Sequence, residues 1–204
     1  MDKNKKGFII VSMRPFKLDH IDETRDTVDQ KLLNWIKEVG YVPLLLPNTH
    51  ELISYLKNKQ IKISGFVIGG GEIKSNSLRY RREKEILTYS IYNKIPTLGI
   101  CHGMQMMSYF EKGKLKKVKN HVSKRHRIIL KHYKNQYPQE VNSFHNYKID
   151  KISKKFNIIA VAEDKSIEAI EHKILPWLGW MWHPERDKVF NKKLISLAKK
   201  FFDV

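Results

Sequence analysis

Short apolar runs alternate with longer amphipathic segments from the start of the chain. The run GFIIVS (7–12) is followed by DETRDTVDQKLLNWIKEVG (22–40), in which apolar residues recur at helical spacing, and then by YVPLLLP (41–47). Periodicity of this kind predicts a strand, a helix and a second strand. Asp22 is placed to cap the helix and Gly40 to end it.

The same alternation continues to about residue 110. Apolar runs predict strands over 63–71 and 95–100, and amphipathic segments predict helices over 49–59, 78–93 and from Met104 to Phe110. Nearly continuous apolar strands separated by amphipathic helices are typical of a mainly parallel sheet covered on both faces. The sequence therefore predicts an α/β fold.

After Phe110 the pattern changes. Residues 112–134 are basic and lack helical periodicity, and RIIL (127–130) reads as a strand, so we expect a β excursion here. Beyond it the pattern predicts strands over 156–164, 167–172 and 177–183 and a closing helix over 187–202. There is no internal repeat and no linker rich in Gly, Pro or Ser, so we expect a single domain over 1–204.

Composition adds a strong positive charge to this picture. Lys and Arg number 39 against 21 Asp and Glu, a formal net charge of +18. Such a charge attracts anionic substrates, nucleic acids or acidic surfaces, although a general bias toward lysine along the chain would produce it too. No apolar run approaches the roughly 18 residues of a membrane span, so no membrane association is expected. The single cysteine excludes an internal disulfide, and we expect a cytoplasmic protein.

That cysteine lies in the stretch GICHGMQMM (99–107). Cys101 follows an apolar strand and precedes a helix, with Gly99 and Gly103 two residues to either side. This is the thiol form of the turn that exposes a nucleophile between strand and helix, where small neighbours let the backbone approach closely. The positive end of the helix dipole would favour the thiolate. A lone cysteine is often only a buried side chain, but this combination favours a nucleophile.

A cysteine nucleophile needs a base, and His183 is the best placed of the nine histidines. It follows an apolar strand in WHPE, where Pro184 restricts the chain and Glu185 comes two residues later. Cys101, His183 and Glu185 would then act as nucleophile, general base and orienting carboxylate.

These motifs resemble the class I (triad) glutamine amidotransferases, and within them the free-standing γ-glutamyl hydrolases of the peptidase C26 type. The resemblance rests on GGG (69–71), GICHGMQ (99–105) and WMWHPE (180–185), in that order. It implies a flavodoxin-like three-layer sandwich with a small β excursion. It also implies a thiol mechanism acting on a γ-glutamyl amide without a metal or organic cofactor.

The resemblance also implies roles for residues around the cysteine. The oxyanion hole would be formed by the backbone N–H groups of His102 and of Gly70 or Gly71, and Gln105 would help hold the glutamyl group. The segment VNSFHNY (141–147) resembles the stretch that binds the glutamyl α-amino and α-carboxyl groups, which points to Phe144, His145, Asn146 and Tyr147. Many relatives have Gln where this chain has Met181.

The group on the leaving nitrogen is harder to predict. The stretch from Ser12 to Asn48 and the segment VNSFHNY look most like the γ-glutamyl-CDP-amidate hydrolases of capsular phosphoramidate biosynthesis. A nucleotide-linked, anionic conjugate would suit the charge, since arginine binds phosphates through two hydrogen bonds at once. The candidate cations, several of which would simply face solvent, are Arg14, Lys17, Arg79, Arg81, Arg82, Lys124, Arg125 and Arg127, with Arg14, Arg81 and Arg82 favoured.

Other functions stay open. One is hydrolysis of a γ-glutamyl-γ-aminobutyrate or polyamine conjugate, although a cationic polyamine would be repelled. Another is a glutaminase subunit that passes ammonia to a synthase partner, and a homo-oligomer is also compatible with the sequence. Nucleic-acid binding is disfavoured, because the chain carries no helix-turn-helix, zinc-finger or RNP signature.

Overall fold

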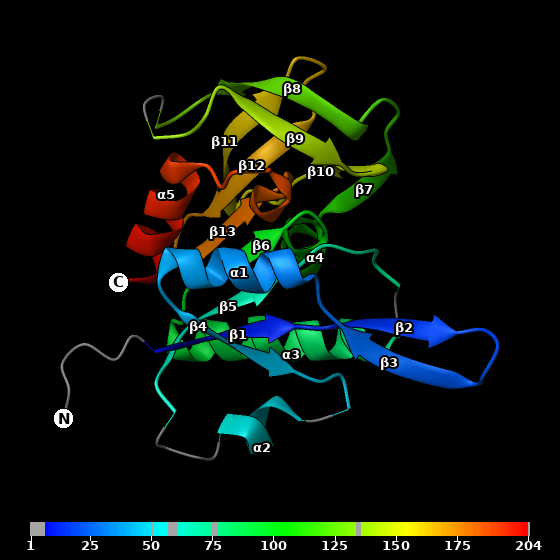
Figure 1. Ribbon diagram of the computed structural model, residues 1–204. Coiled ribbons are helices and arrows are strands. Elements are labelled where there is room, and N and C mark those ends of the chain that lie inside the picture. Colours follow the sequence, from blue (N-terminus) through cyan, green and yellow to red (C-terminus); the bar gives the residue numbers. More distant parts are fainter. Residues whose placement is uncertain (1–6, 50, 57–60, 75–76, 134–135, 204) are drawn as a thin grey trace.

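A single large sheet runs through the middle of the molecule (Figure 1). The computed structural model describes residues 7–49, 51–56, 61–74, 77–133 and 136–203. In these residues the sheet has nine strands. Their spatial order is β4 (Val42–Leu46), β1 (Phe8–Ser12), β5 (Ile63–Ile68), β6 (Thr97–Ile100), β13 (Trp177–Trp180), β12 (Ile167–His172), β11 (Phe156–Ala162), β8 (Val122–Leu130) and β9 (Glu140–Phe144).

The strands from β4 to β13 are parallel, and those beyond β13 are antiparallel. All four residues of β6 and all four of β13 are buried, as expected for strands with helices on both faces. This confirms the predicted parallel sheet. The antiparallel strands are the predicted β excursion and the later strands, which extend the same sheet.

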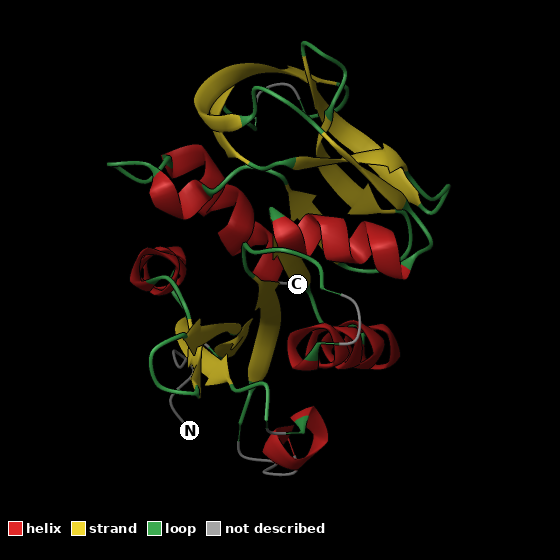
Figure 2. Ribbon diagram, turned by 90° about the vertical axis from the view of Figure 1, so that its right-hand side faces the viewer, coloured by secondary structure: helices red, strands yellow, loops and turns green. Residues whose placement is uncertain are grey.

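Helices cover both faces of the parallel part (Figure 2). On one face α1 (Gln30–Val39) and α5 (Lys192–Phe202) contribute to one apolar cluster. On the other, α3 (Leu78–Asn93) and α4 (His102–Phe110) contribute to a second, and the short α2 (Leu52–Leu56) contacts α3. The predicted flavodoxin-like three-layer sandwich is therefore confirmed.

The first helix begins later than predicted. Its N-cap is Asp29, whose carboxylate accepts a hydrogen bond from the Lys31 N–H at 2.9 Å. Asp22 cannot cap it, because β3 (Glu23–Thr27) pairs with β2 (Arg14–Leu18) in a hairpin that the periodicity did not reveal. The predicted end at Gly40 is confirmed, since its φ of 104° lies in the left-handed region that glycine adopts without strain.

Other boundaries shift for similar local reasons. The closing helix begins at Lys192 rather than 187, where the Asn191 side chain caps it by accepting from the Lys193 N–H at 3.0 Å, and Pro184–Arg186 forms a separate 3-10 turn, η1. The predicted helix over 78–93 is confirmed, with Ser77 as its cap. Of the helix predicted over 49–59, only Leu52–Leu56 is helical in the described residues, and 57–59 lie outside them.

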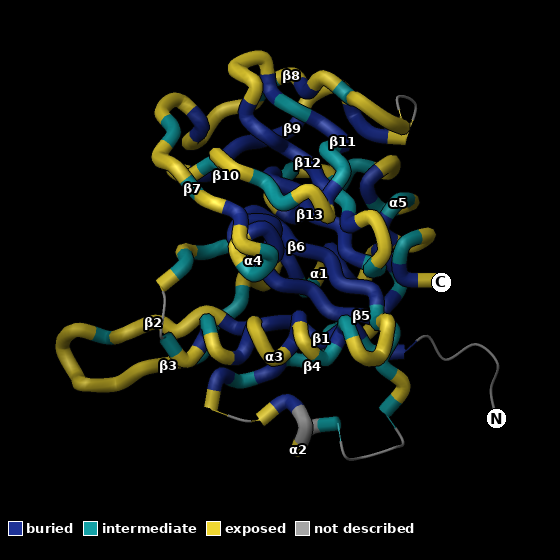
Figure 3. The backbone as a smooth tube through the Cα atoms, turned by 180° about the vertical axis from the view of Figure 1, so that it is seen from behind, coloured by how far each residue is buried: buried dark blue, intermediate teal, exposed yellow. Residues whose placement is uncertain are grey.

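The basic segment after α4 contains β7 (Lys114–Lys117) and β8. β7 pairs with β10 (Tyr147–Lys151) in a small separate sheet, and β9 and β10 were not predicted as strands. Figure 3 shows the buried centre of the main sheet and the exposed β2–β3 hairpin. No helix in the described part of the chain is long and apolar enough to cross a membrane.

Candidate active site

Cys101 occupies a sharp turn between β6 and α4. Its φ of 52° and ψ of −102° are costly for a non-glycine residue and resemble the strained geometry of an exposed nucleophile. The Cys101 N–H donates to the Trp180 carbonyl at 2.7 Å, which fixes the turn against β13. A Cβ on Gly99 would lie 2.5 Å from the Gly103 backbone, and one on Gly103 would lie 2.1 Å from the Ile68 carbonyl oxygen. The turn therefore requires both glycines.

His183 follows β13 and is held at both backbone polar groups. The Asn142 side chain on β9 accepts from the His183 N–H at 2.9 Å and donates to the His183 carbonyl at 2.7 Å. Pro184 starts η1, and this turn brings the Glu185 carboxylate 2.6 Å from the His183 Nδ1 atom. Since Nδ1 is engaged with Glu185, the second ring nitrogen, Nε2, is the one left for the hydrogen bond to Cys101.

The charge of His183 depends on these neighbours. Burial lowers the pKa of the imidazole, but the hydrogen bonds to Cys101 and Glu185 outweigh it and raise that pKa to about 9. At neutral pH the ring is therefore an imidazolium next to the Cys101 sulfur, an arrangement suited to a thiolate nucleophile.

A buried ionic network lies behind the turn. Glu83 on α3 is fully buried, with its carboxylate 2.6 Å from the His102 Nε2 atom and 2.7 Å from the Arg79 Nε atom. Burial alone would raise the pKa of Glu83, but His102 and Arg79 hold it below its ordinary value. The same Arg79 guanidinium donates to the carbonyls of Gly69 and Gly70, at 3.0 and 3.1 Å.

This network sets the direction of the candidate oxyanion donors. In a trans peptide the carbonyl and the following N–H point in opposite directions, and no cis peptide occurs in the described residues. The N–H groups of Gly70 and Gly71 therefore point away from Arg79. Gly71, whose φ is 148°, lines the same cavity as Cys101, while His102 begins α4 directly behind the sulfur.

The cavity in front of Cys101 has a volume of about 520 Å³. Among the predicted site residues it is lined by Arg14, Gly71, Cys101, Gln105, Phe144, His145, Asn146, Tyr147 and His183. The Gln105 amide donates to the Tyr147 carbonyl at 3.0 Å and lies 3.6 Å from the Met181 sulfur. The Met181 sulfur is thus a second acceptor for the Gln105 amide.

Two predicted substrate-binding arginines do not reach this cavity. Arg82 is buried elsewhere, where its guanidinium bonds Glu85 and donates to the Asn48 carbonyl at 3.2 Å. Arg81 is exposed on α3 and lines none of the described pockets. The helix turns by about 100° per residue, so neighbouring arginines on it face different surroundings. Neither Arg81 nor Arg82 lines the cavity in front of Cys101, so its lining gives no support to the predicted role of either in binding substrate.

Several residues that sequence reasoning missed contribute instead. Arg186 lines the cavity with its guanidinium carbon 4.7 Å from the centre of the Phe144 ring, and Asn142 and Glu83 position His183 and His102. Arg186 directly follows WHPE and Asn142 lies within VNSFHNY, and these positions were the available signal. Glu83 gave none, because its role depends on contacts made by folding.

The other basic residues divide into two groups. Lys124 and Arg125 line a second cavity of about 600 Å³, which shares Phe144 and Arg186 with the first. Arg125 is paired there with Glu140 and Asp187. Lys17, paired with Asp22 in the hairpin, and Arg127, on β8, are exposed and line neither cavity.

Residues 20–200 match the family Glutamine amidotransferase class-I. The chain belongs to this family. It is 31% identical to the γ-glutamyl-CDP-amidate hydrolase of Campylobacter jejuni, over 97% of this chain and 98% of that protein. It is 28% identical to a glutamine-hydrolysing GMP synthase subunit of Methanocaldococcus jannaschii, over 74% of this chain and 78% of that protein.

A solved structure supports the fold. A protein of Thermoplasma acidophilum, described as a GMP synthase subunit, has a TM-score of 0.72 at 19% identity, covering 97% of this chain and 94% of that one. With the family shown, the chain is a hydrolase of the glutamine amidotransferase type that acts on an amide C–N bond.

Replacing Glu185 by Gln tests the electrostatics of His183. Loss of the carboxylate removes an interaction that raises the His183 pKa, so this pKa should fall well below 9. In the parent chain the charged His183 ring stabilises the folded state. This contribution is complete below about pH 6.5 and is lost as the pH rises through about 9. In Glu185→Gln, the loss of folding stability at alkaline pH should therefore begin at a lower pH. NMR titration of the His183 ring measures its pKa in the parent and in the variant. The control Glu140→Gln, at an exposed position, should leave this pKa unchanged.

Replacing Arg79 by Lys tests the network behind the loop. Lys keeps a positive charge near Glu83 but lacks the planar fork that holds the Gly69 and Gly70 carbonyls. We expect kcat to fall by about 10²-fold, the effect of a misplaced oxyanion donor, with little change in KM. Arg82→Lys, the same substitution at a buried position on the same helix, is the control and should keep kcat. Equal losses in both variants would contradict the assigned role.

Proposed function

We propose that this protein hydrolyses the γ-glutamyl amide bond of γ-glutamyl-CDP-amidate to glutamate and cytidine diphosphoramidate, for the modification of capsule polysaccharide. The observation that carries the chemistry is the strained Cys101 beside the His183–Glu185 pair, at the floor of a cavity. The near full-length similarity to an enzyme of that name supports the substrate.

In this proposal Cys101 is the nucleophile. Its thiolate attacks the γ-carbonyl carbon, and the N–H groups of His102 and of Gly70 or Gly71 stabilise the developing oxyanion. One such donor is typically worth about 3 to 4 kcal/mol. His183 then donates its proton to the leaving nitrogen, and the C–N bond breaks to leave a γ-glutamyl thioester.

The second half of the reaction uses the same residues. His183, now neutral and oriented by Glu185, takes a proton from water as the water attacks the thioester carbon. The C–S bond breaks, glutamate leaves, and the thiolate and imidazolium return to their starting state. No step in this sequence requires a metal or organic cofactor.

The glutamyl group would occupy the part of the cavity formed by Gln105 and residues 144–147. The Tyr147 carbonyl accepts a hydrogen bond from the Gln105 amide at 3.0 Å and one from the His145 ring at 2.9 Å. The segment is therefore held in place from two sides. A preorganised segment of this kind positions the γ-carbonyl relative to Cys101.

The diphosphate of the leaving group would bind the cations at the mouth of the cavity. Arg14 and Arg186 line the first cavity, and Lys124, Arg125 and Lys188 line the adjoining one. A cationic rim suits a nucleoside diphosphate and disfavours a polyamine conjugate.

A glutaminase that supplies ammonia to a separate synthase is the second candidate. The similarity to the GMP synthase subunit of Methanocaldococcus jannaschii favours it. The chemistry at Cys101 would be the same, and only the group on the nitrogen and the partner would differ.

Comparing substrates separates the two candidates. We expect kcat/KM for γ-glutamyl-CDP-amidate to exceed the values for glutamine and γ-glutamyl-γ-aminobutyrate by about 10²-fold or more. Arg186→Met should raise KM for the nucleotide conjugate and leave hydrolysis of glutamine nearly unchanged. Lys154→Met, at an exposed position away from both cavities, is the control. A preference for glutamine, raised further by an added synthase, would favour the second candidate.

A further inference from the structure

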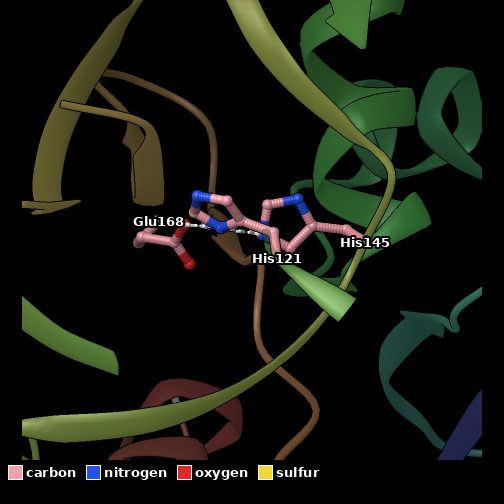
Figure 4. A group of neighbouring side chains, drawn as sticks. All are labelled: His121, His145 and Glu168. Atoms are coloured by element: carbon pink, nitrogen blue, oxygen red, sulfur yellow. Dashed lines mark hydrogen bonds and ion pairs between the residues drawn. The ribbon is translucent and has the colours of Figure 1, made fainter. Parts of the chain in front are cut away.

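A cluster of buried side chains lies behind the substrate-binding segment. We call His121, His145 and Glu168 the His–His–Glu cluster; their exposures are 5%, 3% and 0%. They come from separate parts of the chain: His121 directly precedes β8, His145 directly follows β9, and Glu168 lies on β12. Figure 4 shows the three side chains converging.

The distances between the inward atoms are those of ligands around one small ion. His121 Nδ1 lies 3.2 Å from His145 Nε2, and these nitrogens lie 3.8 and 3.5 Å from Glu168 Oε1. Ligand atoms placed about 2.0 to 2.1 Å from a tetrahedral zinc ion are about 3.3 Å apart. The three atoms therefore leave room for a metal between them with only small adjustments.

Hydrogen bonds on the far side of each ring decide which nitrogens carry protons. His145 Nδ1 lies 2.9 Å from the Tyr147 carbonyl, so it must donate. His121 Nε2 lies 3.2 Å from the Asp164 carboxylate and donates there. The inward nitrogens then carry lone pairs, as in metal-bound histidines whose other nitrogen is held by a carbonyl or carboxylate.

Other groups near the cluster do not supply the missing positive charge between these atoms. The Ser143 hydroxyl donates to the His121 carbonyl at 2.7 Å, so it cannot also donate to Nδ1. Glu168 has no hydrogen-bond partner for either carboxylate oxygen among the described residues, although His126 Nε2 lies 3.4 Å from Oε2. His126 can offset the charge of Glu168 at Oε2, but the two inward lone pairs still face Oε1, which is unfavourable without a proton or metal ion between them.

We propose that the His–His–Glu cluster binds one divalent transition-metal ion, best matched by Zn²⁺, through His121 Nδ1, His145 Nε2 and Glu168 Oε1. Two imidazoles and a carboxylate form a donor set that zinc accepts. The alternative to a metal ion is an extra proton on one of the two inward nitrogens, which would form hydrogen bonds between the same three atoms.

The metal would act on structure rather than on the hydrolysis. Through His145 it fixes the Tyr147 carbonyl, which also receives the Gln105 amide in the cavity. The His–His–Glu cluster is separate from Cys101. Its three residues lie on separate segments that meet only in the folded chain, so sequence spacing did not predict the cluster.

Metal analysis of the full chain, purified without a metal-affinity tag or chelator, tests the proposal. Inductively coupled plasma mass spectrometry should find about one zinc ion per chain, and His121→Asn or Glu168→Gln should lower this at least about 10-fold. The exposed His132→Asn is the matched control and should retain the metal.

Two measurements on the unmodified chain remain decisive even where a variant fails to fold. Zinc added to chelator-treated protein should raise Tm, and cobalt substitution should give the intense visible bands of tetrahedral Co²⁺. A chain purified without metal that shows neither change would overturn the proposal and assign the cluster to a shared proton. Because these readouts do not depend on the amide cleaved, such a failure would leave the proposed function untouched.

Discussion

The buried carboxylate of Glu83 connects the two halves of the active site. One oxygen contacts His102, directly after the nucleophile, and the other contacts Arg79, which holds the loop opposite. Burying a charge is unfavourable unless its partners satisfy it, and removal of one partner from a buried pair typically costs about 3 to 5 kcal/mol. The ionic network therefore couples the stability of the fold to the relative position of the Cys101 turn and the glycine loop.

The site forms where the parallel and antiparallel parts of the sheet meet. β6 and β13 are adjacent and parallel, with Gly99 opposite Gly179, so Cys101 and His183 emerge from the same edge of the sheet. The antiparallel part then completes the site from the other side, since Asn142 on β9 clamps His183 and the segment that follows β9 lines the cavity. The strand register thus places the nucleophile and the base, and the extension builds the substrate pocket.

The sequence predicted features whose causes are local. The Cys101 turn, the His183–Glu185 pair and the bounds of α3 follow from residue spacing, flanking glycines and helical periodicity. It failed where long-range contacts decide. The β2–β3 hairpin displaced the first helix cap to Asp29. The contacts of α3 placed Arg79 behind the loop, while Arg82 bonds the exposed Glu85 and the Asn48 carbonyl. The His–His–Glu cluster has no local signature, because its three residues meet only in the folded chain.

The central claim is that Cys101 forms a covalent bond with the γ-glutamyl carbon. Rapid acid quenching during the first turnover of γ-glutamyl-CDP-amidate, followed by mass spectrometry of the peptide that contains Cys101, measures it most directly. The account predicts a mass increase of one γ-glutamyl group on Cys101, absent in Cys101→Ala, which should also lose hydrolysis. Unchanged turnover in Cys101→Ala, or a γ-glutamyl group attached to another residue, would contradict it.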